Sequence, residues 1–96
     1  MPAYVIADVS VTDPDKYEGY KALSPGAIAK HGGRFLARGG QSRTLEGDWK
    51  PGRLVVLEFP TYEQAQAFYT SVEYTAARRA RAGATSRFNM VVVEGL

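Results

Sequence analysis

Two hydrophobic periodicities alternate along this chain, and their order limits the folds it can adopt. Four short segments rich in β-branched residues place apolar side chains at every second position, which is typical of strands. Two longer segments repeat apolar side chains at helical spacing. The predicted strands cover residues 3–11, 34–38, 53–59 and 87–94, and the predicted helices cover 14–31 and 62–83. This β-α-β-β-α-β order predicts an α+β, ferredoxin-like fold with a four-stranded antiparallel sheet in one domain, residues 1–96.

Local residues mark where the first helix begins and where it is disturbed. Thr12 or Asp13 can cap it, and Pro14 suits the first helical position. Pro25 lacks a backbone donor, so we expect it to break or kink the helix near Ser24.

Glycine pairs and hydroxyl residues punctuate the rest of the chain. We expect Gly32-Gly33 to end the first helix in a left-handed turn, and Gly39-Gly40 to form a bulge or tight bend. Thr61 and Gln64 match a capping box for the second helix, which we expect to pause at Ser71.

The helices of such a fold cover one face of the sheet, so the other face must be polar or hidden. With the strand order 4-1-3-2, period two predicts a helix-free face that mixes apolar and charged side chains. They are Tyr4, Ile6, Leu36, Leu54 and Val56 together with Asp8, Glu58 and Arg38. The face is too apolar for a solvent-exposed surface, and its charged side chains are of both signs. We therefore expect a homodimer through this face, with Arg38 either paired to Glu58 or Asp8 or binding an anionic ligand. The alternation does not decide which face of the last strand meets the helices.

Composition excludes several classes of site. The chain has no cysteine and one histidine, so neither a thiolate site nor a two-histidine metal site can form within one copy. We expect no metal and no cofactor. The third strand, RLVVLEF, has no aromatic residue for base stacking on its open face, which argues against nucleic acid. No segment has the length and hydropathy of a signal peptide or a membrane span, so we expect a cytoplasmic protein without a membrane partner.

Residues 74–93 contain no acidic side chain although the net charge is only +2. The stretch carries four arginines, Arg78, Arg79, Arg81 and Arg87. They form either a solvated helix face or a patch that meets an anion.

Seven residues are candidates for a functional site. His31, Asp8 and Glu58 are candidate catalytic groups, because a histidine titrates near neutrality and two carboxylates can share acid and base roles. His31 can instead be a cation at a helix C-terminus. The candidate ligand-binding residues are Arg38, Trp49, Tyr69 and Tyr74. Trp49 lies in a predicted turn, where it covers a pocket, a partner or its own core, and the two tyrosines can equally be core residues.

The chain resembles the family called domain of unknown function 1330, within the dimeric α+β barrel superfamily. The matching stretches are AYVIADVSVTDPDKYEGY, HGGRFLARGG, LEGDWKPGRLVVLEFP and AQAFYTSVEYTAARRARAG. The resemblance implies a cytoplasmic homodimer whose two sheets close a barrel. It implies no particular reaction, because the superfamily includes cofactor-independent monooxygenases, haem-handling proteins, isomerases and ligand-binding modules.

Two functions follow as hypotheses. The first is a small dimeric protein that binds a small molecule near the sheet. The second is a cofactor-independent enzyme, similar to a monooxygenase or isomerase, acting on a small anionic or aromatic substrate.

Overall fold

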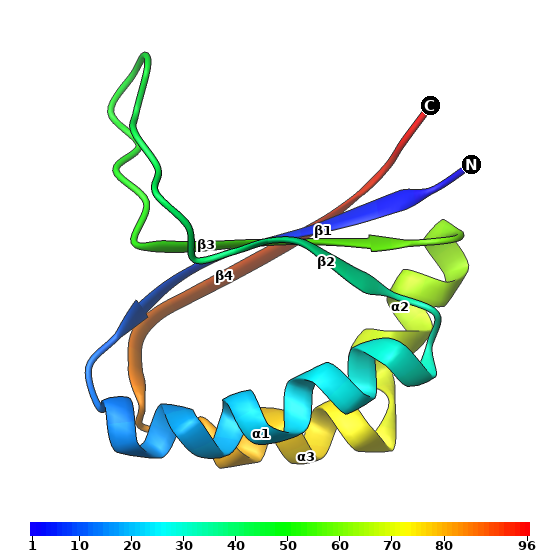
Figure 1. Ribbon diagram of the computed structural model, residues 1–96, viewed down its shortest axis with the longest axis horizontal. Coiled ribbons are helices and arrows are strands. Elements are labelled where there is room, and N and C mark those ends of the chain that lie inside the picture. Colours follow the sequence, from blue (N-terminus) through cyan, green and yellow to red (C-terminus); the bar gives the residue numbers. More distant parts are fainter.

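A four-stranded antiparallel sheet with helices on only one face makes up the protein, as the computed structural model of residues 1–96 shows (Figure 1). Its elements are β1 (Ala3–Val11), α1 (Pro14–Lys30), β2 (Arg34–Arg38), β3 (Arg53–Phe59), α2 (Tyr62–Thr70), α3 (Val72–Ala80) and β4 (Thr85–Glu94). The strand order is β2-β3-β1-β4, as predicted, with all neighbours antiparallel.

The core lies between the sheet and the helices. Alternate residues of β1, from Ala3 to Val9, are at most 5% exposed and face the helices. In β4, Phe88 pairs with Val9 and Met90 with Ala7, and these residues pack against the same core. This register shows which face of β4 meets the helices, which the alternation in the sequence left undecided. It is the face of Phe88, Met90 and Val92.

The helix α1 begins as predicted but is not broken by its proline. Asp13 is the N-cap, and its side chain accepts a hydrogen bond from the Lys16 amide at 3.2 Å. The helix then runs without interruption through Pro25 to Lys30. Of the expected break or kink near Ser24, the break was wrong, because α1 buries side chains on both sides of the proline, including Tyr20 and Ile28, and this packing offsets the loss of one hydrogen bond.

The end of α1 is a Schellman motif. Gly32 has φ +80°, and its amide donates to Ala29 O at 3.0 Å while the Gly33 amide donates to Ile28 O at 2.9 Å. Gly33 then lies directly against the ring of Phe59, where a side chain would not fit. The turn therefore requires glycine at residue 32 for its backbone conformation and at residue 33 for close packing against Phe59.

Ser71 separates α2 from α3, as predicted. Its backbone is extended, its hydroxyl donates to Phe68 O at 2.7 Å, and the same oxygen accepts from the Tyr74 amide at 3.1 Å. Thr61 caps α2 by accepting from the Gln64 amide at 3.1 Å. One serine thus closes one helix and opens the next.

The strand β2 contains a β-bulge that changes the side on which its last residues lie. Phe35 pairs with Leu57, but the register shifts at Leu36, so that Ala37 pairs with Val56 and Arg38 with Val55. Arg38 therefore shares a face with Val55, toward the helices. The prediction that Arg38 lies on the helix-free face was wrong, because the bulge reverses the alternation and comes earlier than the predicted bend at Gly39.

The segment between β2 and β3 projects from the sheet on the side opposite the helices (Figure 1). We call residues 40–52 the arm. The Thr44 hydroxyl donates to Trp49 O at 2.6 Å, and Leu45 in the arm is 92% exposed. The two chain ends lie together on the same side of the sheet, where the Gly95 amide donates to Pro2 O at 2.7 Å. None of the helices is long and apolar enough to cross a membrane.

Gly33→Ala is expected to lower the free energy of unfolding by about 1–3 kcal/mol, the usual range for overpacking a core. A methyl group there would lie 2.5 Å from the Phe59 ring and 2.9 Å from Ile28 Cγ2. Urea denaturation measures the change. Gly26→Ala is the matched control, because nothing lies within 4 Å of that position in α1, and it should stabilise the protein by up to about 1 kcal/mol. Equal effects of the two variants would contradict the packing of Gly33.

Candidate functional site

A cavity of about 510 Å³ lies between α2 and the edge strand β4. We call it the α2–β4 pocket. Eight of its 12 lining residues are hydrophobic. The lining residues are Val5, Ala65, Gln66, Phe68, Tyr69, Thr70, Arg81, Phe88, Asn89, Met90, Val91 and Val92. Five consecutive residues of β4 take part, so the pocket extends around the free edge of the sheet.

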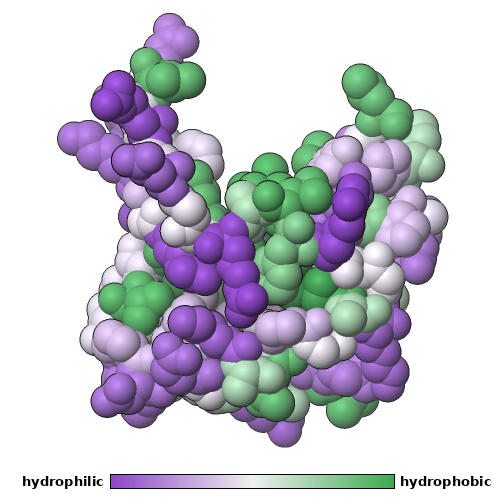
Figure 2. Space-filling model, in the orientation of Figure 1, coloured by the Kyte–Doolittle hydropathy of each residue, from purple (hydrophilic) through white to green (hydrophobic).

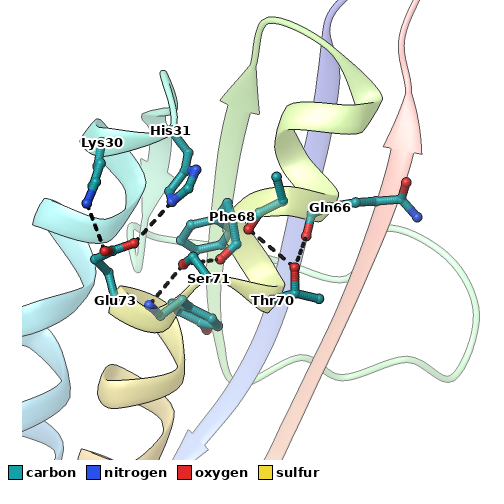
Figure 3. A network of polar contacts seen from close by, with 9 residues as sticks. Lys30, His31, Gln66, Phe68, Thr70, Ser71 and Glu73 are labelled. Atoms are coloured by element: carbon teal, nitrogen blue, oxygen red, sulfur yellow. Dashed lines mark hydrogen bonds and ion pairs between the residues drawn. The ribbon is translucent and has the colours of Figure 1, made fainter.

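The polar groups of the α2–β4 pocket come from α2, from β4 and from the end of α3. Figure 3 shows the Gln66 side chain extending from α2 toward β4. The Thr70 hydroxyl is already used, since it donates to Gln66 O at 3.3 Å. Asn89 and Arg81 complete the polar set.

Arg81 is the only charged residue that lines this pocket. It caps the C-terminus of α3, and its guanidinium carbon lies 3.6 Å from the centre of the Phe88 ring and 5.5 Å from that of Tyr20. Arg81 forms no salt bridge, and its buried Nε has no hydrogen-bond partner. A guanidinium held against aromatic rings without a counter-ion has the chemistry to bind an anion.

The other arginines of the acid-free stretch have different surroundings. Arg78 lies over the Tyr69 ring at 4.7 Å, Arg87 pairs with Asp8 at 3.1 Å, and Arg79 is exposed. The four arginines therefore form neither one solvated helix face nor one anion-binding patch, because each has different surroundings. Arg81 was not predicted as an individual site residue, although the absence of acids around it in the sequence was a visible signal.

Two phenols lie side by side in the core near Arg81. The hydroxyls of Tyr20 and Tyr74 are 2.8 Å apart, and the Tyr74 hydroxyl donates to Met90 Sδ at 3.4 Å. Burial raises the pKa of both tyrosines, and Arg81 acts on them in the opposite direction. Both phenols therefore stay neutral near neutral pH. Tyr69 lines the α2–β4 pocket, whereas Tyr74 lies behind it, 5.7 Å from Tyr69 between ring centres.

Asp8 is buried, and it holds the arm against the sheet. Its oxygens accept from Trp49 Nε1 at 2.9 Å, the Gly52 amide at 2.9 Å and Arg87 at 3.1 Å. The hydrogen bond from Trp49 lowers the pKa of Asp8, burial acts against it, and Gly52 and Arg87 lower it further. Asp8 and Trp49 therefore form an attachment point on the helix-free face, and neither lines the α2–β4 pocket.

The predicted trio of Arg38, Glu58 and Asp8 does not exist. Glu58 binds Arg34 of β2, at 2.7 Å. It lies opposite Tyr4 in β1, four residues from Asp8, which separates the two carboxylates by roughly 13 Å along the strand. Arg38 lies on the helix side, 4.4 Å above the Phe35 ring. The expected ion pair of Arg38 was wrong, and the two carboxylates are too far apart to act as a pair.

His31 lies at the junction of α1 and α3, outside the pocket (Figure 3). Its Nε2 is 3.3 Å from Glu73 Oε1, and Lys30 Nζ is 2.9 Å from Glu73 Oε2. The hydrogen bond from Lys30, followed by that from His31, lowers the pKa of Glu73 to about 2. The structure thus places His31 as the C-cap of α1, in a polar contact between two helices. No group of three or more histidine, aspartate and glutamate side chains lies where it could hold a metal ion.

The sheet order, the one-sided helices and the pocket define a ferredoxin-like α+β protein. The chain belongs to the family Domain of unknown function (DUF1330), whose model matches residues 2–96. No curated protein matches it.

Several solved structures share the fold. A protein of unknown function from Rhodopseudomonas palustris is 19% identical with a TM-score of 0.74, over 99% of this chain and 82% of that one. A dimeric ferredoxin-like protein of unknown function from Jannaschia sp. is 14% identical with a TM-score of 0.70, over 99% and 100%. A putative antibiotic biosynthesis monooxygenase from Nitrosomonas europaea is 21% identical with a TM-score of 0.63, over 99% and 90%. At these identities the likeness shows the fold alone.

Asp8→Asn is expected to loosen the arm, because the one remaining acceptor oxygen cannot serve three donors. Trp49 is the only tryptophan, so its fluorescence anisotropy reports the attachment, and it should fall at neutral pH. In the wild type the folded pKa lies below 3.8, so the attachment should hold from pH 7 to about 4 and be lost as the pH falls further. Glu58→Gln is the control and should leave the anisotropy unchanged. An unchanged signal in Asp8→Asn would show that the carboxylate does not hold the arm.

Proposed function

We propose that residues 1–96 form a single domain that assembles as a homodimer and binds one small molecule per copy in the α2–β4 pocket. The observation that carries this proposal is the pocket itself. Its volume of about 510 Å³ lies within the usual range for small-molecule sites, and its mostly apolar wall with a few polar groups is typical of them.

The positions of the titratable groups favour binding over acid–base catalysis. The candidate groups His31, Asp8 and Glu58 all lie outside the lining of the α2–β4 pocket. A general acid or base must come within hydrogen-bond reach of the proton it transfers. A cofactor-independent enzyme at this site would thus have to draw on the reactivity of its own substrate. The likeness to a putative monooxygenase keeps that alternative as the second candidate.

The homodimer is supported by the helix-free face of the sheet. Val91 and Val93 of β4 are 59% and 48% exposed there, beside the partly exposed Tyr4, Ile6 and Val56. Figure 2 shows a hollow between the arm and the chain ends with apolar side chains at its base. Such a face is costly to leave in water, and a second copy about a two-fold axis would cover both faces at once and close a barrel. Similar structures from Jannaschia sp. and Thermobifida fusca are described as dimeric.

The arm gives this proposed dimer a second contact. It projects on the same side as the helix-free face and carries Leu45 and Trp49, which are 92% and 58% exposed. In a two-fold dimer each arm would reach over the edge of the partner sheet. The attachment of Trp49 to Asp8 would hold the arm ready for that contact.

Gln66→Trp is expected to fill the α2–β4 pocket and prevent binding. Native mass spectrometry of the purified protein would show a small molecule retained by the wild type and absent from the variant. Ala67→Trp is the matched control, because residue 67 is exposed on the same helix but does not line the pocket. It should retain the molecule. Retention by Gln66→Trp to the same degree would place the bound molecule elsewhere.

Val56→Glu is expected to prevent dimer formation, because it places a charge at the centre of an interface that should bury more than about 1,000 Å². Light scattering after gel filtration should give about 21 kDa for the wild type, twice the chain mass of 10.5 kDa, and a monomer or an aggregate for the variant. Val72→Glu is the control, since Val72 is 81% exposed at the start of α3. A well-folded wild-type monomer at micromolar concentration would overturn the dimer.

A further inference from the structure

The charge of Arg81 is not neutralised within the protein. It has no salt bridge, and its Nε is buried without a partner. The two acids that border the acid-free stretch cannot serve it: Glu73 is held by Lys30 and His31, and Glu94 ends β4 beyond the pocket. The guanidinium lines the α2–β4 pocket without a counter-ion, so its charge is free to meet an anion there.

The neighbours of the Arg81 guanidinium hold it in place without neutralising it. Phe88 stacks against it at 3.6 Å and Tyr20 lies at 5.5 Å, both measured to the ring centre. The phenols of Tyr20 and Tyr74 are hydrogen-bonded to each other and are neutral. The guanidinium is therefore positioned in advance, which lowers the entropy that the Arg81 side chain loses when a ligand binds.

We propose that the natural ligand of the α2–β4 pocket is a monocarboxylate with an apolar body, and that Arg81 binds its carboxylate. This inference rests on the proposed function and deepens it by naming the ligand class. It assigns to Arg81 the anion-binding role that the sequence had suggested for Arg38.

The count of charges in the pocket sets the charge of the ligand. Arg81 is the only cation in the lining, and the lining contains no acid. A monoanion gives a neutral site, whereas a phosphate dianion would leave one charge uncompensated beside apolar walls. The planar guanidinium also matches a carboxylate, because it can offer two parallel N–H donors.

The other lining residues of the pocket indicate that the rest of the ligand, apart from its carboxylate, is apolar. Phe68, Met90 and Val92 line the pocket from α2 and β4, and Tyr69 adds an aromatic face. These side chains favour a ring or an alkyl chain next to the carboxylate.

Calorimetric titration with pairs of acids and their amides tests the proposal in the wild-type dimer. The probes are 3-phenylpropionate with 3-phenylpropionamide and octanoate with octanamide, which differ within each pair only in the charged group. At least one acid should bind more tightly than its amide by about ten-fold or more, because a charge-assisted hydrogen bond is lost in the amide.

Variants of Arg81 then locate the effect. Arg81→Gln should remove the preference for the acid, so that the two dissociation constants agree within about two-fold, while Arg81→Lys should keep part of it. Arg79→Gln is the control, because Arg79 is exposed two residues away and does not line the pocket. It should keep the full preference. The comparison of acid and amide in the wild type needs no variant. It therefore shows whether the site prefers a negatively charged ligand even if Arg81→Gln fails to fold.

Two kinds of failure remain distinct. If no acid binds more tightly than its amide, or if Arg81→Lys and Arg81→Gln both keep the full preference, the carboxylate assignment to Arg81 is overturned. If the amides bind at least as tightly as the acids and Gln66→Trp prevents that binding, the pocket still binds small molecules and only the ligand class is wrong. If no probe binds and the wild type retains no small molecule in native mass spectrometry, both the ligand class and the proposed function fail.

Discussion

Packing both helical segments on one face of a four-stranded sheet is the constraint on which the rest of this structure depends. The core between the helices and the sheet contains small residues of β1, such as Ala3 and Ala7. It also contains larger residues of other elements, such as Phe59 of β3 and Phe68 of α2. The small residues allow the helices to approach the sheet closely. The opposite face keeps apolar side chains without cover. The unequal faces thus leave the helix-free side apolar and exposed, while the pocket lies beside the helices and extends around the edge at β4.

The pocket exists because α2 and α3 are separate helices. Ser71 interrupts the helical run, so α2 turns toward the edge strand β4 while α3 packs against α1. Arg81, at the far end of α3, then enters the same cavity and stacks on Phe88. The interruption at Ser71 therefore separates the helix that lines the pocket from the helix that packs against α1.

Asp8 is buried and Arg81 is partly buried, and their charges meet different surroundings. Asp8 receives three donors, from the arm and from β4, so its charge is fully used in attaching the arm to the sheet. Arg81 receives aromatic contacts but no acid. A polar partner stabilises a charged group that is removed from water. The protein supplies the partner for Asp8, and we infer that a ligand supplies it for Arg81.

The sequence by itself determined the element types, the bounds of β1, β2 and β3, and the caps at Thr61, Ser71 and Gly32, because these depend on periodicity and on hydrogen bonds within a few residues. Only the tertiary structure decided the side on which Arg38 lies, since a bulge depends on pairing with β3. The tertiary structure alone also decided that α1 continues through Pro25. It alone decided that Arg81 lines the pocket without an acidic partner. Each of these outcomes depends on contacts between residues far apart in the chain, whose energies a local pattern does not contain.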